Sequence, residues 1–187
     1  MLRRALFIFF FFVVMTAPFS RGGATTVLPL SLERLAAQAE RIFVGRCQGV
    51  STELDERGVP ATYARFQVEE GLKGVAGGGT VLIKQFGASR PELKVAEGES
   101  VLVSPKTMTL AGASYRPGAS YLLFLYPESD WGFTSPVGGG QGRFEIDGSG
   151  ASALTVNPLD NRFLKTFRDG PVPLDRMIGE IRTIVDR

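Results

Sequence analysis

Alternating apolar and polar positions predict a series of antiparallel strands through the middle of the chain. The clearest run, residues 61–70, has apolar side chains at Ala64, Phe66 and Val68 and larger or polar ones at Tyr63, Arg65, Gln67 and Glu69. A period of two places these two sets on opposite faces of one strand. We therefore expect Phe66 and Val68 to share one core with Leu123 and Leu125, and Tyr63 and Arg65 to be exposed.

Weaker forms of the same signal predict further strands at 41–51, 80–86, 121–126, 143–147 and 153–156. In the first of these, Ile42, Val44 and Val50 are expected on one face, and Phe43 and Cys47 on the other. The segment at 121–126 is apolar at consecutive positions, which is typical of a central strand.

Glycine, proline and short polar runs mark the connections between these strands. Residues 54–60 predict a hairpin turn, residues 74–79 a flexible loop, and residues 131–137 follow a turn at 128–130. The stretch 87–117 contains several prolines, and we expect a long excursion with one or two short strands, one of them at 101–103. Such a long loop is a candidate recognition element.

Helices are predicted at both ends of this strand region. Ser31 can cap a helix over residues 32–39, and a second helix over residues 174–186 follows Pro173. The second carries apolar residues on one face, at Leu174, Met177, Ile178, Ile181 and Val185. A shorter helix is predicted at 160–168. The fold class is therefore mainly β with flanking helices, as a small antiparallel β-barrel, with an α+β sandwich as the alternative.

The first 24 residues resemble an export signal. Arg3 and Arg4 precede a largely apolar run of 13 residues, Ala5–Ala17, and Gly22 and Ala24 suit a cleavage site after Ala24. The run is shorter than the ~20 residues that span a membrane as a permanent helix, so an uncleaved anchor is the weaker alternative. We expect residues 25–187 to form a single domain that is secreted or periplasmic, with no membrane attachment after cleavage.

Composition then excludes several classes of function. Of 187 residues none is His and one is Cys, which excludes a Ser-His-Asp triad, a Cys-His dyad and an intramolecular disulfide. Without the first 24 residues, 18 basic and 19 acidic residues remain, a net charge of −1. This balance gives no electrostatic basis for nucleic-acid binding.

Candidate catalytic and ligand motifs each have a structural explanation. The run Gly138–Gly142 precedes a strand rather than a helix, so a turn is expected in place of a phosphate loop. Glu69 and Glu70 face opposite sides of a strand and cannot act as one acid/base pair. Cys47 is expected to be a buried apolar residue, an intermolecular disulfide being the alternative. Nucleophile motifs and calcium loops are not found, so we expect neither metal nor cofactor.

One ordered series of segments resembles a known family. It comprises the helix 32–39, the strand at 41–46 ending in Val44 and Gly45, the turn Glu69–Gly74 and the strand Gly118–Leu125. The series resembles a group of uncharacterised exported bacterial proteins. It is also similar to the OB-fold of the netrin module and of the tissue inhibitors of metalloproteinases (TIMP-like). The resemblance implies a closed five-stranded barrel with helices packed on it. No inhibitory residue of that family has a counterpart in this sequence, because those inhibitors act through a Cys at the mature N-terminus and this chain has no Cys near Thr25.

These observations favour an exported soluble binding or interaction module without a catalytic centre, whose partner is another exported protein. The residues expected to bind it are Tyr63 and Arg65, because an aromatic ring and a guanidinium on one strand face suit a recognition surface. A solvated sheet face is the structural alternative. Two other functions stay open: a TIMP-like protease inhibitor or protease-associated module acting through its loops, and an enzyme that uses carboxylates brought together by the fold.

Overall fold

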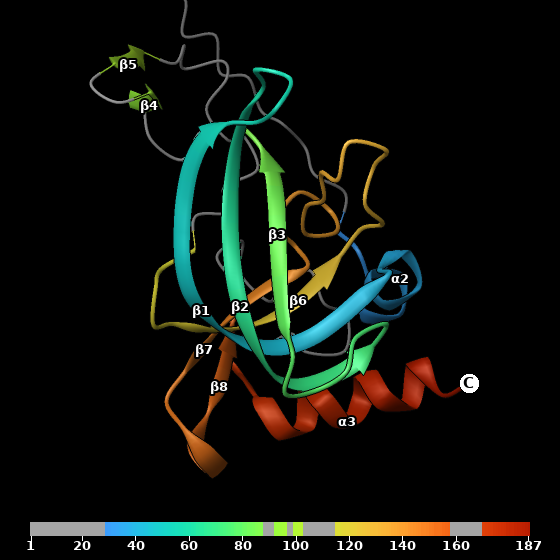
Figure 1. Ribbon diagram of the computed structural model, residues 1–187. Helices are drawn as coiled ribbons and strands as arrows, with labels where there is room; N and C mark the ends of the chain where they lie inside the picture. Colours follow the sequence, from blue (N-terminus) through green and yellow to red (C-terminus); the bar gives the residue numbers. More distant parts are fainter. Residues whose placement is uncertain (1–28, 88–91, 97–98, 103–114, 158–169) are drawn as a thin grey trace, which may run out of the picture.

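A seven-stranded antiparallel sheet dominates the structure, a computed structural model that describes residues 29–87, 92–96, 99–102, 115–157 and 170–187. Its strands follow the order β3-β2-β1-β6-β7-β8-β9 (Figure 1). They are β1 (Arg41–Leu54), β2 (Pro60–Lys73), β3 (Thr80–Phe86), β6 (Ser120–Leu125), β7 (Arg143–Asp147), β8 (Leu154–Val156) and β9 (Val172–Pro173). A separate hairpin consists of β4 (Glu92–Ala96) and β5 (Glu99–Leu102). The helices are α2 (Leu32–Gln38), α3 (Leu174–Val185) and a single 3₁₀ turn at Gly150–Ser152.

The expected fold class, mainly β with flanking helices, is confirmed, but a closed barrel is not. In the described part of the chain, β3 lies at one edge of the sheet and β9 at the other, and they do not pair with each other. Residues 131–137 form no strand; they contribute isolated bridges from Phe133 to Lys84 and from Pro136 to Leu125. The sheet is therefore open.

Two cores lie on opposite faces of the sheet because its central strands are apolar on both sides. One face of β6 directs Tyr121, Leu123 and Leu125 into what we call the inner core, which also contains Phe66 and Val68. The other face directs Leu122 and Phe124 into the helix-side core. All five residues from Tyr121 to Leu125 are fully buried, which confirms the central strand and the shared core predicted for Phe66, Val68, Leu123 and Leu125.

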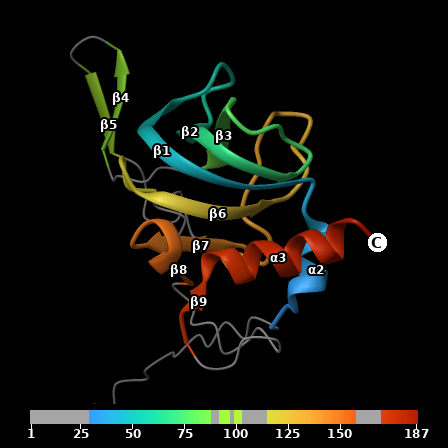
Figure 2. The same cartoon turned by 90° about the horizontal axis from the view of Figure 1, so that it is seen from below.

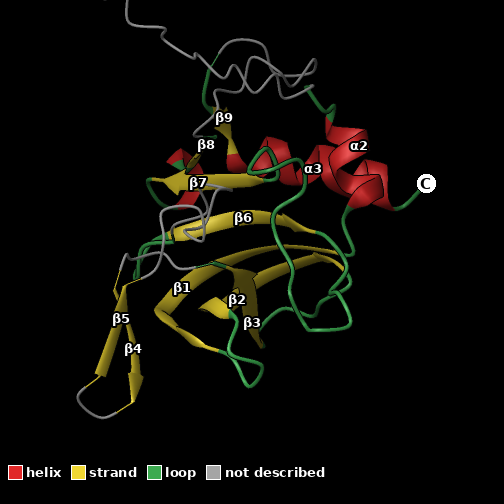
Figure 3. Ribbon diagram, turned by 90° about the horizontal axis from the view of Figure 1, so that it is seen from above, coloured by secondary structure: helices red, strands yellow, loops and turns green. Residues whose placement is uncertain are grey.

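Both helices cover the same side of the sheet, next to β6 and β7, while β1, β2 and β3 curl away on the other side (Figures 2 and 3). Ser31 caps α2 by accepting a hydrogen bond from the Arg34 amide, as predicted. The Lys73 ammonium of β2 donates to the carbonyl oxygens of Ala36 and Ala39 at the end of α2, at 2.8 and 2.7 Å. These bonds satisfy two carbonyl oxygens at the end of the helix.

The apolar face of α3 packs as its periodicity predicts. Met177 and Ile181 are fully buried in the helix-side core, and Leu174, Ile178 and Val185 pack against it. An ion pair of 2.8 Å between Arg182 and Glu70 joins the helix to β2.

The face assigned to Val50 from the sequence is wrong. Val50 packs against the inner core beside Phe43 and Cys47, not on the side of Ile42 and Val44. The reason is a shift of register between Cys47 and Gly49, where β1 has one more residue than β2. This β-bulge reverses the phase of alternation for the rest of the strand.

Some predictions fall on residues outside the described ranges: the export signal at 1–24, the short helix at 160–168 and much of the excursion at 87–117. Within that excursion, β5 ends at Leu102, so it overlaps the strand expected at 101–103. Among the described residues, no helix is both long enough and apolar enough to cross a membrane.

Candidate functional site

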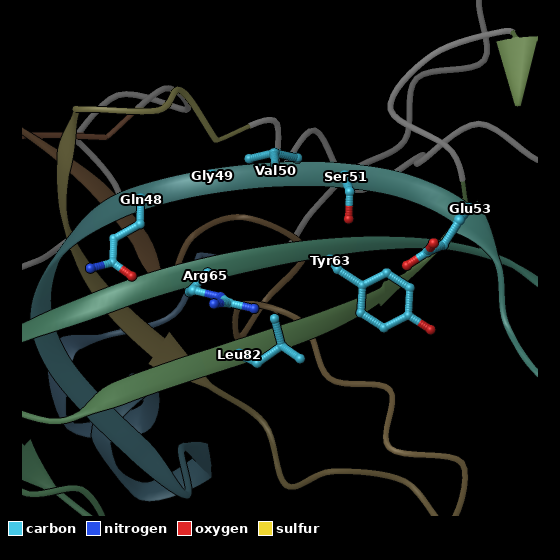
Figure 4. A pocket seen from close by; sticks show the side chains of 8 residues that line it. All are labelled: Gln48, Gly49, Val50, Ser51, Glu53, Tyr63, Arg65 and Leu82. Atoms are coloured by element: carbon cyan, nitrogen blue, oxygen red, sulfur yellow. The ribbon is translucent and has the colours of Figure 1, made fainter. Parts of the chain in front are cut away.

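Tyr63 and Arg65, chosen from the sequence as binding residues, line one open groove on the outer face of β1, β2 and β3 (Figure 4). The groove has a volume of about 720 Å³. Its lining consists of Gln48, Gly49, Val50, Ser51, Glu53, Tyr63, Arg65 and Leu82. It lies on the opposite face of β2 from Phe66, so the core and the groove share one strand.

The bulge in β1 produces the hollow beside Arg65. Gly49 is the residue paired with Arg65, and Ser51 is paired with Tyr63. A Cβ atom placed on Gly49 would meet no atom within 4 Å, and its φ lies outside the left-handed region. Because paired residues direct their side chains to the same face, the missing side chain at Gly49 leaves open space next to the guanidinium.

Two charges in the groove lack partners within the described ranges. The side chains of Arg65 and Glu53 are both exposed, and neither makes an ion pair or a hydrogen bond with a described residue. In contrast, Arg46 is paired with Glu69 at 3.5 Å just beyond the groove. An unpaired guanidinium is a ready donor for a carboxylate of a ligand.

Apolar surface continues from the groove along the outer face of β3. Leu82 is 49% exposed and Phe86 is 59% exposed on the same face of this edge strand. Next to Phe86, Phe133 makes an edge-to-face contact at 6.0 Å, and the Arg57 guanidinium lies 5.3 Å from the ring of the exposed Trp131. The groove therefore opens onto a row of exposed aliphatic and aromatic side chains.

A buried ion pair holds the end of the β1–β2 hairpin in place. Asp55 Oδ2 accepts a hydrogen bond of 2.9 Å from Lys84 Nζ of β3, and the Asp55 side chain is 1% exposed. Its Oδ1 accepts from the amides of Arg57 and Val59, at 2.9 Å each. The Lys84 hydrogen bond, followed by these amide bonds, lowers the pKa of the Asp55 carboxyl. The turn predicted at 54–60 is thus fixed to β3.

The remaining candidates have structural roles. Cys47 is buried and free, and burial raises the pKa of its thiol, as expected for an apolar core position. The expectation that Glu69 and Glu70 face opposite sides is wrong: a register shift leaves Glu69 as an extra residue in β2, and both carboxylates lie on the face of Val44 and Arg46. Each is held by a separate guanidinium, Glu69 by Arg46 and Glu70 by Arg182. The Gly138–Gly142 run forms the turn before β7. Within the described ranges, no three acidic, Cys or His side chains gather closely enough to hold a metal ion.

The other six residues of the groove were not selected from the sequence, among them Gly49, Glu53 and Leu82. The sequence carried a signal for two of them: a glycine inside a strand, such as Gly49, often marks a bulge, and Leu82 lies at a polar-phase position of β3. No protein family model, curated protein or solved structure matches the chain. The resemblance to the netrin module and the tissue inhibitors of metalloproteinases stays a prediction.

Proposed function

We propose that the chain is an exported binding module without a catalytic centre, and that the groove is its recognition surface for another exported protein. The observation that carries the proposal is the position of Tyr63 and Arg65 side by side in the groove, with the guanidinium unpaired among the described residues. Tyrosine and arginine are among the residue types that dominate binding energy at protein interfaces. The exposed Leu82 adds apolar surface at the rim.

The residues that line the groove favour binding over catalysis. Glu53 is the one carboxylate among them, whereas the enzyme alternative relies on carboxylates brought together by the fold. The groove is open and lies on a sheet face that is supported from behind by the inner core. A rigid, exposed surface of this kind suits the contact area of a macromolecular partner.

The finer fold assignment, an OB-like barrel, belongs to the same proposal. The curl of β1, β2 and β3 and the bridge between Lys84 and Phe133 support it, because that bridge brings the segment after β6 against the free edge of β3. Export is proposed from residues 1–24, and the intact mass of the extracytoplasmic protein should lack them. A full-length species retained in the membrane would contradict this.

Site-specific photocrosslinking tests the binding surface. The photoreactive residue p-benzoylphenylalanine replaces Leu82 at the groove, and in a matched control it replaces Leu154 of β8, which is 36% exposed. A specific adduct with an extracytoplasmic protein is expected from position 82 and not from position 154. Tyr63→Ala and Arg65→Ala should each reduce the yield of the adduct several-fold, with unchanged melting temperature.

Equal adduct yields from wild type and from both alanine variants would refute the proposal. Identification of the adduct also separates the alternatives. If the partner is a protease whose activity falls in the complex, the module acts as an inhibitor. A hydrolytic activity of the purified chain that one carboxylate substitution abolishes would instead establish an enzyme.

A further inference from the structure

We infer that the ligand of the groove is an extended peptide segment of a protein, with an acidic side chain next to Arg65 and a basic side chain next to Glu53. This inference rests on the proposed function and specifies the chemistry of the partner. It follows from three features of the groove: the sign of its two unpaired charges, the distance between them, and the aromatic ring that lies between them (Figure 4).

Two cations next to the groove already have acidic partners, whereas the two charges inside the groove have none among the described residues. At one end, Arg46 is neutralised by Glu69, and on β3, opposite Tyr63, Lys84 is neutralised by Asp55. Arg65 and Glu53, in contrast, have no partner among the described residues. A ligand with one charge of each sign would therefore gain an ion pair at each position without displacing an existing one.

The distance between Arg65 and Glu53 favours an extended peptide over a helical one. Arg65 is paired with Gly49, and Glu53 is paired with Ala61, so the two charged positions are four residues apart along both strands. At about 3.3 Å per residue, their Cα positions are ~13 Å apart along the sheet. Side chains at positions i and i+4 of an extended peptide have the same separation and face the same side. In a helix those positions are only about 5–6 Å apart.

The residues at the centre of the groove indicate which type of side chain the peptide carries between its two charges. Tyr63 lies two residues from Arg65 on β2, and its partner Ser51 lies two residues from Glu53 on β1. The side chain at position i+2 of the peptide would then rest on the Tyr63 ring. Leu82, paired with Arg65 on β3 and 49% exposed, borders this place. An apolar residue at i+2 fits the pair of an aromatic ring and an aliphatic side chain.

Three labelled peptides of nine residues test the inference by fluorescence anisotropy. The first alternates Ser and Thr, with Asp at its third position, Leu at its fifth and Lys at its seventh. The second has the same composition with the two charges two residues apart, and the third replaces the charges with Asn and Gln. At low salt the first should bind about tenfold more tightly than the others, since each partly exposed ion pair contributes modestly.

Variants of the groove make the test specific. Arg65→Glu should reduce binding of the first peptide to the level of the uncharged one. The double variant Glu53→Arg/Arg65→Glu should restore binding, because the reversed charges accept the peptide in the opposite direction. Gly49→Leu should block the hollow without strain in the backbone, since a Cβ there meets no neighbouring atom within 4 Å. Arg46→Gln, an exposed change just outside the groove, is the matched control.

Equal binding of all three peptides, or no recovery in the double variant, would overturn the inference. These failures differ from failure of the proposed function. If the peptides fail while Arg65→Ala still lowers the crosslink from position 82, the binding module stands and its ligand is not an extended charged peptide. If that crosslink is also unaffected by Arg65→Ala and Tyr63→Ala, the groove is not the binding surface at all.

Discussion

Replacing Phe66 with Ala tests whether the inner core holds the curled sheet together. The Phe66 side chain is fully buried, and its ring makes edge-to-face contacts with Tyr115 at 5.0 Å and with Phe43 and Tyr121 at 6.0 Å. Truncation to alanine loses the transfer free energy of the ring and leaves a cavity, which together cost ~3–5 kcal/mol. Three aromatic contacts are lost as well, each contributing ~0.5–1.5 kcal/mol.

We expect a loss near the upper end of that range, about 4–5 kcal/mol, because paired strands on both sides of β2 limit collapse of the cavity. Urea unfolding followed by far-ultraviolet circular dichroism measures it, with the slope of the transition unchanged. Tyr63→Ala, on the opposite face of the same strand, is the control and should cost less than ~1 kcal/mol. A loss from Phe66→Ala below ~1 kcal/mol, or equal to that of the control, would refute the face assignment.

Three further changes probe other parts of the fold. Ile181→Asp places a charge in the helix-side core and should release α3, seen as lost hydrogen-exchange protection over 174–185; unchanged protection would mean that the helix does not dock. Because the pKa of Asp55 is lowered, its stabilisation is complete above the ordinary value of 3.8 and is lost as pH falls through the folded-state pKa. In Asp55→Asn, the free energy of unfolding measured by urea melts should therefore decrease less steeply as the pH is lowered. An unchanged dependence on acid pH would show that the Asp55–Lys84 ion pair does not contribute to it. The buried Cys47 thiol should react with Ellman's reagent only after unfolding, and rapid reaction of the folded protein would show an accessible thiol.

The elements that the sequence predicts well are those whose pattern is set by burial alone. In β2, one face meets the inner core and the other meets solvent, so alternation gives the correct faces for Phe66 and Arg65. In α3, the apolar stripe matches the residues that enter the helix-side core. These patterns are local, and no knowledge of neighbouring strands is needed to recognise them.

The parts that the sequence did not predict depend on pairing between distant segments. Whether the sheet closes depends on pairing between its edge strands, β3 and β9, which do not pair, and sequence periodicity does not determine this. Similarly, Glu53 joins the groove only because β1 and β2 pair in a particular register. Tyr63 and Arg65 were found because they share a strand, whereas Glu53 and Leu82 lie on its two neighbours.

Deletion of Gly49 separates the role of the bulge in the fold from its role in the groove. Gln48 and Gly49 together oppose Arg65, so one residue is extra in β1. Without Gly49 the strand alternates regularly, which keeps Val50 in the inner core and Ser51 on the outer face. We therefore expect the deletion to change stability by less than ~1 kcal/mol in urea melts, as for changes that leave the core intact.

The same deletion should abolish binding in the groove. Gln48 would become the sole partner of Arg65, and its amide side chain would occupy the hollow that Gly49 leaves open. The charged nine-residue peptide should then bind no better than its uncharged form, in a protein that melts like the wild type. A stability loss of ~3 kcal/mol or more, comparable to a core truncation, would show that the bulge is needed for the curl of the sheet. Full peptide binding by a stable deletion variant would show that the hollow beside Arg65 is not where the ligand lies.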